Sequence, residues 1–99
     1  MERIKNIHPG EVIQEEFLVP FKISIPRLAK GTGIQLTRIT DIINGKKRIT
    51  AEVALRLSVF FGNSPKFWLG LQDDYDIEEG IISKKTKIES IKRFSASAI

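Results

Sequence analysis

The stretch that most constrains the fold of this chain runs from residue 24 to residue 48. Apolar residues at helical spacing lie on both sides of a glycine turn at Gly33. Two helices that cross at about 90–120° need a small residue where their backbones approach, and Ala29 supplies one. They also need a turn residue that can take a positive φ, which glycine does most easily. The stretch therefore predicts a helix-turn-helix motif.

The second helix of this motif, expected over residues 35–44, has two different faces. The apolar face collects Leu36, Ile39, Ile42 and Ile43. The polar face collects Thr37, Thr40, Asp41 and Asn44, with Arg38 on its flank. Asn44 and Gly45 are expected to close the helix, because both residue types tolerate the left-handed conformation of a helix end.

Short polar side chains on an exposed helix match the hydrogen-bonding groups of the DNA major groove. Arg38 suits guanine or a phosphate, and Asn44 suits adenine. Thr37 and Thr40 suit a thymine methyl group or a phosphate. Asp41 repels phosphates. It therefore either accepts a hydrogen bond from the amino group of cytosine or disfavours binding to DNA of the wrong sequence. The alternative is a polar face that contacts only solvent. The predicted DNA contacts are Gln35, Thr37, Arg38, Thr40, Asp41, Asn44, Lys46, Lys47 and Arg48.

Charge is segregated along the chain, whose net charge is +4. Residues 22–48 carry seven cations against one acid, residues 73–79 carry five acids, and residues 80–99 carry five cations against one acid. The three cations at 46–48 directly follow the second helix of the motif, where they suit phosphates better than bases. Such concentrated cations indicate a polyanionic partner. The alternative is an ordinary solvated surface.

The rest of the chain is predicted to form further helices around this motif. Helical spacing predicts helices over about residues 9–20, 25–30, 35–44 and 51–61, and a fifth from residue 65 that fades into the acidic run before Gly80. Pro20 is expected to end or bend the first helix. Leu55 and Val59 add a second apolar stripe to the fourth helix, which we therefore expect to be mostly buried. The predicted N-caps are Ser24, Thr50 and Ser64.

These elements predict an all-α protein with a five-helix domain at residues 1–79 and a basic C-terminal tail at residues 80–99. Helix-turn-helix proteins usually read two half-sites as dimers. The fifth helix is rich in aromatic residues, so we expect it to pair two copies of the chain. The predicted interface residues are Phe67, Trp68, Leu71 and Tyr75. Core packing is the alternative for Phe67 and Trp68, and both roles hold if they use opposite sides of the helix.

Other classes of function find little support in the sequence. The chain has no cysteine and one histidine, which argues against disulfides, thiol catalysis, a metal site or a bound cofactor. His8 lacks an accompanying nucleophile or orienting acid, so we expect it to start the first helix rather than to catalyse a reaction. The sequence has no apolar run near about 18 residues and no N-terminal signal pattern. We therefore expect a cytoplasmic protein that does not contact membranes and is not an enzyme.

Several motifs resemble those of the HigA antitoxins, which belong to the lambda-repressor-like class of helix-turn-helix proteins. These motifs are His8-Pro9-Gly10-Glu11, Leu28-Ala29 with Gly33, Asn44-Gly45-Lys46, Ile49-Thr50-Ala51 with Ala54-Leu55-Arg56-Leu57, and Phe67-Trp68-Leu69 with Leu71-Gln72. The resemblance covers about residues 7–79. Two positions depart from it: Lys22 stands where many members have glycine, and Gly31 interrupts the end of the second helix. We expect both to cost local stability.

The resemblance implies a function. HigA proteins bind and inhibit a HigB toxin, an mRNA-cleaving ribonuclease, and as homodimers they bind a palindromic operator to repress their own operon. On this basis the recognition face and basic loop would include Thr37, Arg38, Thr40, Asn44, Lys46 and Lys47. Toxin-binding residues do not carry over. Two alternatives stay open: a stand-alone repressor without a toxin, and a protein-interaction module whose helix-turn-helix is only architectural.

Overall fold

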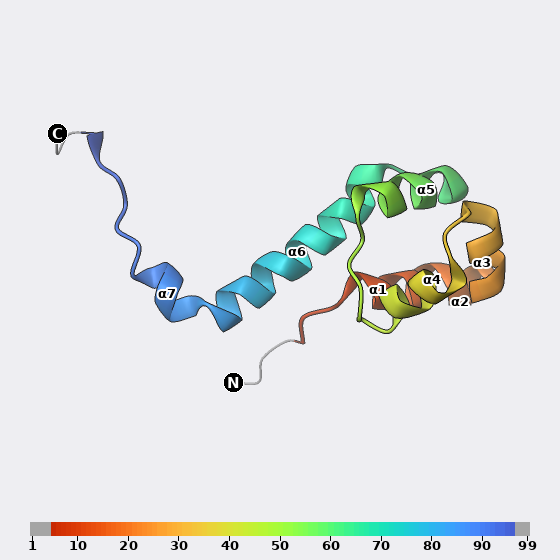
Figure 1. Cartoon of the computed structure of the whole chain (residues 1–99), viewed down its shortest axis with the longest axis horizontal. Helices are drawn as coiled ribbons and strands as arrows, with labels where there is room; N and C mark the ends of the chain where they lie inside the picture. The colour runs from red at the N-terminus through yellow and green to blue at the C-terminus, as the bar shows by residue number, and fades with distance from the viewer. Residues whose placement is uncertain (1–4, 97–99) are drawn as a thin grey trace.

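The computed structural model describes residues 5–96, and the regular structure within them is entirely helical (Figure 1). The elements are α1 (Pro9–Val12), the π-helical segment η1 (Ile13–Leu18), α2 (Val19–Phe21), α3 (Ile25–Thr32), α4 (Leu36–Ile43), α5 (Ala51–Phe61), α6 (Pro65–Ser83) and α7 (Lys85–Glu89). The first three follow one another without a break and form the first of the five predicted helices. The predicted all-α class is confirmed, and α7 adds a short helix that the sequence did not indicate.

The first helical stretch changes its hydrogen-bonding register before Pro20. In η1 the N–H of Val19 donates to the carbonyl of Gln14, five residues back, and Pro20, which has no N–H, follows directly. The helix continues to Phe21 and ends at Lys22, which takes the left-handed conformation with φ of 55°. A left-handed residue at this point explains why a glycine would fit there better than Lys22 does.

The helix-turn-helix forms as predicted from α3 and α4. Ser24 accepts from the N–H of Arg27 at 3.1 Å and caps α3. Gly33 takes a φ of 74° at the turn, and its N–H donates to the carbonyl of Ala29. The expectation that Gly31 interrupts α3 is wrong, because the helix runs through it to Thr32. A Cβ at Gly31 would strike the ring of Phe60, so the glycine lets α5 pack against α3.

The core lies where α1, η1, α3, α4, α5 and α6 meet. Its buried apolar residues are Ile13, Leu18, Leu28, Ile34, Ile39, Ile42, Ile49, Val53, Ala54, Leu57 and Trp68. Two sequence expectations about burial are wrong. Leu36 is 48% exposed, and on α5 Leu55 and Val59 are 56% and 85% exposed. The fourth predicted helix is therefore buried on one face only, because no element of the described chain covers its outer side.

Helix α6 is longer than predicted and leaves the globular head as an arm. It continues through Gly80 to Ser83, so the expectation that it fades before Gly80 is wrong. Figure 1 shows α6 projecting away from the other helices, with α7 near its far end. Every described residue from 81 to 96 is exposed, and the molecule measures 57 × 34 × 21 Å along its principal axes. The head thus holds the core, whereas the outer part of the arm, residues 81–96, packs against no part of the head in the described protomer.

Candidate nucleic-acid interface

Helix α4 is held against the head by the start of the first helix. A Cβ at Gly10 would overlap the main chain of Ile42 and Ile43, so only glycine permits this approach of α1 to the end of α4. His8 sets the start of α1, because its Nδ1 accepts from the N–H of Gly10 at 2.9 Å. The predicted role of His8 at the helix start is confirmed. The approach of Gly10 to α4 was not foreseen, since a contact between distant segments leaves no local pattern.

Burial lowers the pKa of His8 below its ordinary value of 6.5, while the nearby carboxylates of Glu11 and Asp76 act in the opposite direction. The neutral ring suits the cap, because Nδ1 must carry a free electron pair to accept from Gly10. The same ring meets the ring of Tyr75 edge-on, with centroids 4.9 Å apart. His8 therefore joins α1 to α6 next to the end of α4.

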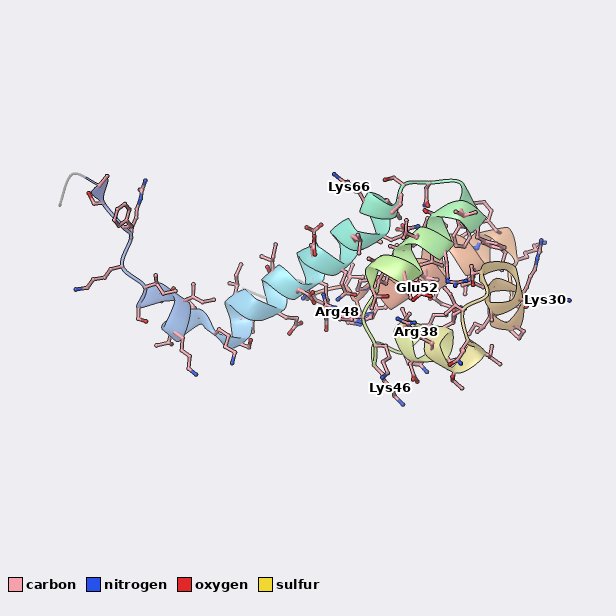
Figure 2. The ribbon with its side chains drawn as sticks, turned by 45° about the horizontal axis from the view of Figure 1, so that its top comes forward. Lys30, Arg38, Lys46, Arg48, Glu52 and Lys66 are labelled. Atoms are coloured by element: carbon pink, nitrogen blue, oxygen red, sulfur yellow. The ribbon has the colours of Figure 1, made fainter. Side chains whose placement is uncertain are left out.

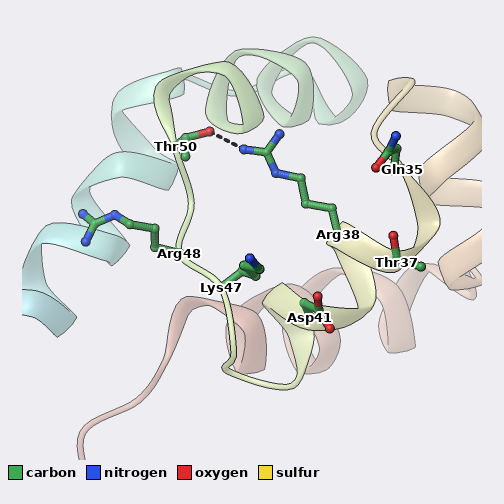
Figure 3. Close-up of a pocket in the computed structure, with 7 residues that line it drawn as sticks. All are labelled: Gln35, Thr37, Arg38, Asp41, Lys47, Arg48 and Thr50. Carbon is green, nitrogen blue, oxygen red and sulfur yellow. Dashed lines mark hydrogen bonds between the residues drawn. The ribbon is translucent and has the colours of Figure 1, made fainter.

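The exposed side of α4 and the following loop line one surface pocket of about 410 Å³ (Figure 3). The residues around it are Gln35, Thr37, Arg38, Asp41, Lys47, Arg48 and Thr50. Six of the nine predicted DNA contacts thus lie around one hollow, and Thr50 joins them. The remaining three are placed differently: Asn44 and Lys46 are exposed beyond the end of α4, and Thr40 donates from its hydroxyl to the carbonyl of Leu36 at 2.9 Å.

Arg38 reaches from α4 across the pocket to the start of α5. Its Nη2 donates to the hydroxyl of Thr50 at 3.0 Å (Figure 3). The same hydroxyl accepts from the N–H of Val53 at 3.3 Å, which confirms Thr50 as the N-cap of α5. Thr50 therefore fixes the direction of the Arg38 side chain as well as the helix start. The sequence marked Thr50 only as a cap.

The basic loop leaves α4 through a tight glycine turn. Gly45 has a φ of 77°, and the N–H groups of Lys46 and Lys47 donate to the carbonyl of Asp41 at 2.8 and 3.3 Å. The side chains of both lysines are exposed. Arg48 differs from them, because its guanidinium pairs with Asp76 of α6 at 2.7 Å. Figure 2 shows Arg38, Arg48 and Lys46 on the same side of the head, with Lys46 extending outward and Lys30 at the opposite edge.

The predicted dimer residues do not share one surface. Trp68 is fully buried, and its Nε1 donates to Asn63 at 2.8 Å. The prediction that Trp68 contacts a second copy is therefore wrong, because the protomer's own core covers it. Phe67 is 41% exposed, whereas Leu71 and Tyr75 are half-buried. For these three residues an interface role stays a prediction.

Residues 5–96 contain neither a cluster of metal ligands nor a membrane-spanning helix. No group of three or more histidine, cysteine, aspartate or glutamate side chains in this range is arranged to hold a metal ion. Among the described helices, none combines the length and the apolar character needed to cross a membrane.

Comparison with known proteins agrees with this geometry. A family model described as helix-turn-helix matches residues 15–68. Virulence-associated protein I of Dichelobacter nodosus is 42% identical over 72 residues, which span 73% of this chain and 67% of that protein. An addiction module antidote protein of the HigA family from Coxiella burnetii has a TM-score of 0.86 at 44% identity, and covers 92% of this chain and 100% of that one.

A second solved structure, described as Pseudomonas aeruginosa antitoxin HigA with the higBA promoter, also has a TM-score of 0.86. It is 32% identical, with 92% of this chain and 100% of that chain covered. The chain therefore belongs to the helix-turn-helix proteins and, within them, to the family of the HigA antitoxins.

Proposed function

We propose that this protein is an antitoxin that binds operator DNA through α4 and the loop after it, and so represses its own operon. The observation that carries the proposal is the shared pocket, in which α4 and the loop bring polar and cationic side chains together. The polar groups suit base edges, and the exposed lysines suit the phosphates on either side. The Pseudomonas aeruginosa relative described with promoter DNA supports the same use of the motif.

We propose a HigB-like ribonuclease toxin as the protein partner. Family membership is the first support. The second is charge: the acidic run at residues 73–79 lies on α6, where Asp73 and Asp74 are exposed. A protein that binds RNA must present cations to its phosphates, and an acidic helix is complementary to such a surface.

We further propose that the active form is a homodimer joined through the α6 arm. Ile77 and Ile81 lie one turn apart on α6 and are 62% and 51% exposed, and Ile88, Ile91 and Phe94 continue the apolar exposure beyond it. In an antiparallel pairing of two arms, the acids at 73–79 of one copy face the cations at 84–93 of the other. Such a pairing would cover the exposed apolar side chains and join opposite charges.

The test of DNA binding is a titration of the full chain against a duplex from upstream of its own gene, at several salt concentrations. We expect a footprint with two related half-sites and an affinity that falls steeply with salt, because phosphate contacts release counterions. An affinity that does not change with salt would contradict DNA binding through this surface.

The partner and the dimer have separate tests. Co-expression with the neighbouring gene product should give a complex that co-purifies, and a repressor that binds its operator but captures no neighbour would favour the stand-alone alternative. In sedimentation, Ile81→Asp should convert a dimer to a monomer. The matched control is Val59→Asp, which makes the same change at an exposed apolar position of α5 and should leave the dimer intact. A dimeric Ile81→Asp variant would refute pairing through the arm.

A further inference from the structure

The loop that follows α4 is fixed from α6 by two polar side chains. The buried Gln72 accepts from the N–H of Ile49 at 2.7 Å through Oε1, and donates through Nε2 to Oδ1 of Asp76 at 2.9 Å. Asp76 in turn accepts from Nη2 of Arg48 at 2.7 Å through Oδ2. A chain of three hydrogen bonds therefore joins α6 to two successive residues of the loop.

This chain of bonds and the end of α4 hold the loop at its two ends. At its beginning the N–H groups of Lys46 and Lys47 donate to the carbonyl of Asp41. At its end Ile49 is buried in the core, and its N–H donates to Oε1 of Gln72. A buried N–H without an acceptor is costly, so Gln72 dictates where the loop enters the core. The two exposed lysines lie at the first of these fixed points, directly before Arg48 and Ile49.

We propose that Gln72 and Asp76 are positioning residues for DNA binding, which set the loop so that Lys46 and Lys47 face the phosphate backbone. The inference rests on the proposed function of the α4 surface. Neither residue needs to touch DNA for this role. Asp76 acts by pairing with the guanidinium of Arg48, and Gln72 acts by accepting from the main-chain N–H of Ile49.

Because Asp76 is charged, a positioning role can be distinguished from a general electrostatic effect on DNA affinity. Replacing an acid near a DNA-binding surface by a neutral residue adds one positive charge to the protein, which by itself strengthens attraction to DNA. The loss of the Arg48 pairing loosens the loop and weakens the fit to phosphates. The two views therefore predict opposite signs for Asp76→Asn.

The experiment measures the affinity of the full chain for the promoter duplex, at several salt concentrations, for the wild type, Asp76→Asn and Gln72→Met. The matched control is Glu15→Gln, which makes the same charge change at an exposed position of η1, outside the acidic run of α6. Circular dichroism establishes the folded fraction at the assay temperature. We expect Asp76→Asn to bind about threefold to tenfold more weakly than the wild type, and Gln72→Met at least as weakly. Glu15→Gln should bind at least as tightly as the wild type.

The salt dependence and the loop amides supply readouts that a loss of stability alone would not change. We expect the slope of log K against log salt to become shallower in both weakened variants, and the backbone amide resonances of Lys46 and Lys47 to shift without DNA present. If Asp76→Asn binds as tightly as Glu15→Gln while the wild type binds with a steep salt slope, the positioning role is refuted and the DNA-binding role stands. If the wild type itself does not bind the duplex in a salt-dependent manner, both are refuted. Asp76 is partly exposed, so its variant tests the inference even if Gln72→Met does not fold.

Discussion

The contact between Gly10 and the end of α4 makes Gly10→Ala an informative substitution. The added methyl group would overlap the carbonyl of Ile42 and press on the Cα of Ile43. These are main-chain atoms of a packed helix, so no side-chain rotation can relieve the overlap. Overpacking of a core contact usually costs about 1–3 kcal/mol, and a rigid partner keeps this site away from the lower end of that range. We therefore expect Gly10→Ala to lower the free energy of unfolding by about 2 kcal/mol.

For a domain of this size, such a loss corresponds to a fall of about 8–16 °C in the thermal midpoint. Thermal unfolding measures this fall directly, when it is followed by the far-ultraviolet circular dichroism signal of the helices. The matched control is Gly70→Ala, because a Cβ at Gly70 meets nothing within 4 Å. There alanine should raise the midpoint, since it favours a helix interior by up to about 1 kcal/mol over glycine. Equal midpoints for the two alanine variants would refute the reasoning about close approach.

Further predictions concern ionisable side chains. The stability due to His8 should be complete above about pH 6.5 and lost as the pH falls through the lowered pKa of the folded state, because protonation removes the cap acceptor. Lys22→Gly should raise the free energy of unfolding by about 1 kcal/mol, since glycine accepts the left-handed conformation. Arg38→Ala should weaken operator binding by about 1–3 kcal/mol. Lys46→Ala with Lys47→Ala should make the salt slope shallower by about two units.

Three of these predictions, those for His8, Arg38 and the lysine pair, have their own control. His8→Asn keeps a capping oxygen without a titrating ring, so it should flatten the pH profile of thermal unfolding between pH 5 and 7, a range chosen around the ordinary histidine pKa of about 6.5. For Arg38→Ala, an equal loss on an unrelated duplex would identify a phosphate contact rather than a base contact. For the lysine pair, the control is Lys66→Ala, at an exposed lysine away from α4 (Figure 2), whose slope should match the wild type. An unchanged slope in the Lys46 and Lys47 variant would place those lysines away from the backbone of the DNA.

The local features of the fold could be predicted from the sequence because each depends on a few neighbouring residues. The caps at Ser24 and Thr50 and the turn at Gly33 are local hydrogen-bonding and steric requirements, and all three form as expected. The polar face of α4 follows from helical spacing, which is why most of the predicted contacts surround one pocket.

The predictions that were wrong concern features that depend on which parts of the folded chain contact one another. An apolar stripe predicts burial only when another element covers it, and nothing within the described protomer covers Leu55 and Val59. Gly80 was expected to end a helix, but an isolated glycine costs a helix interior only about 1 kcal/mol, and α6 continues through it. Gln72 satisfies a main-chain group 23 positions earlier, and the sequence carries no periodic signal for such a bond.

The unbroken course of α6 limits how the length of the arm can change. Its 19 residues rise by about 1.5 Å each, and successive residues turn by about 100° around the axis. Inserting one residue in its middle would therefore rotate everything beyond it by more than a quarter turn, and would move the exposed isoleucines to another side of the arm. Insertions or deletions of three or four residues nearly restore the original direction. To keep the exposed isoleucines on the same side, the arm can thus lengthen or shorten only in steps close to one helical turn.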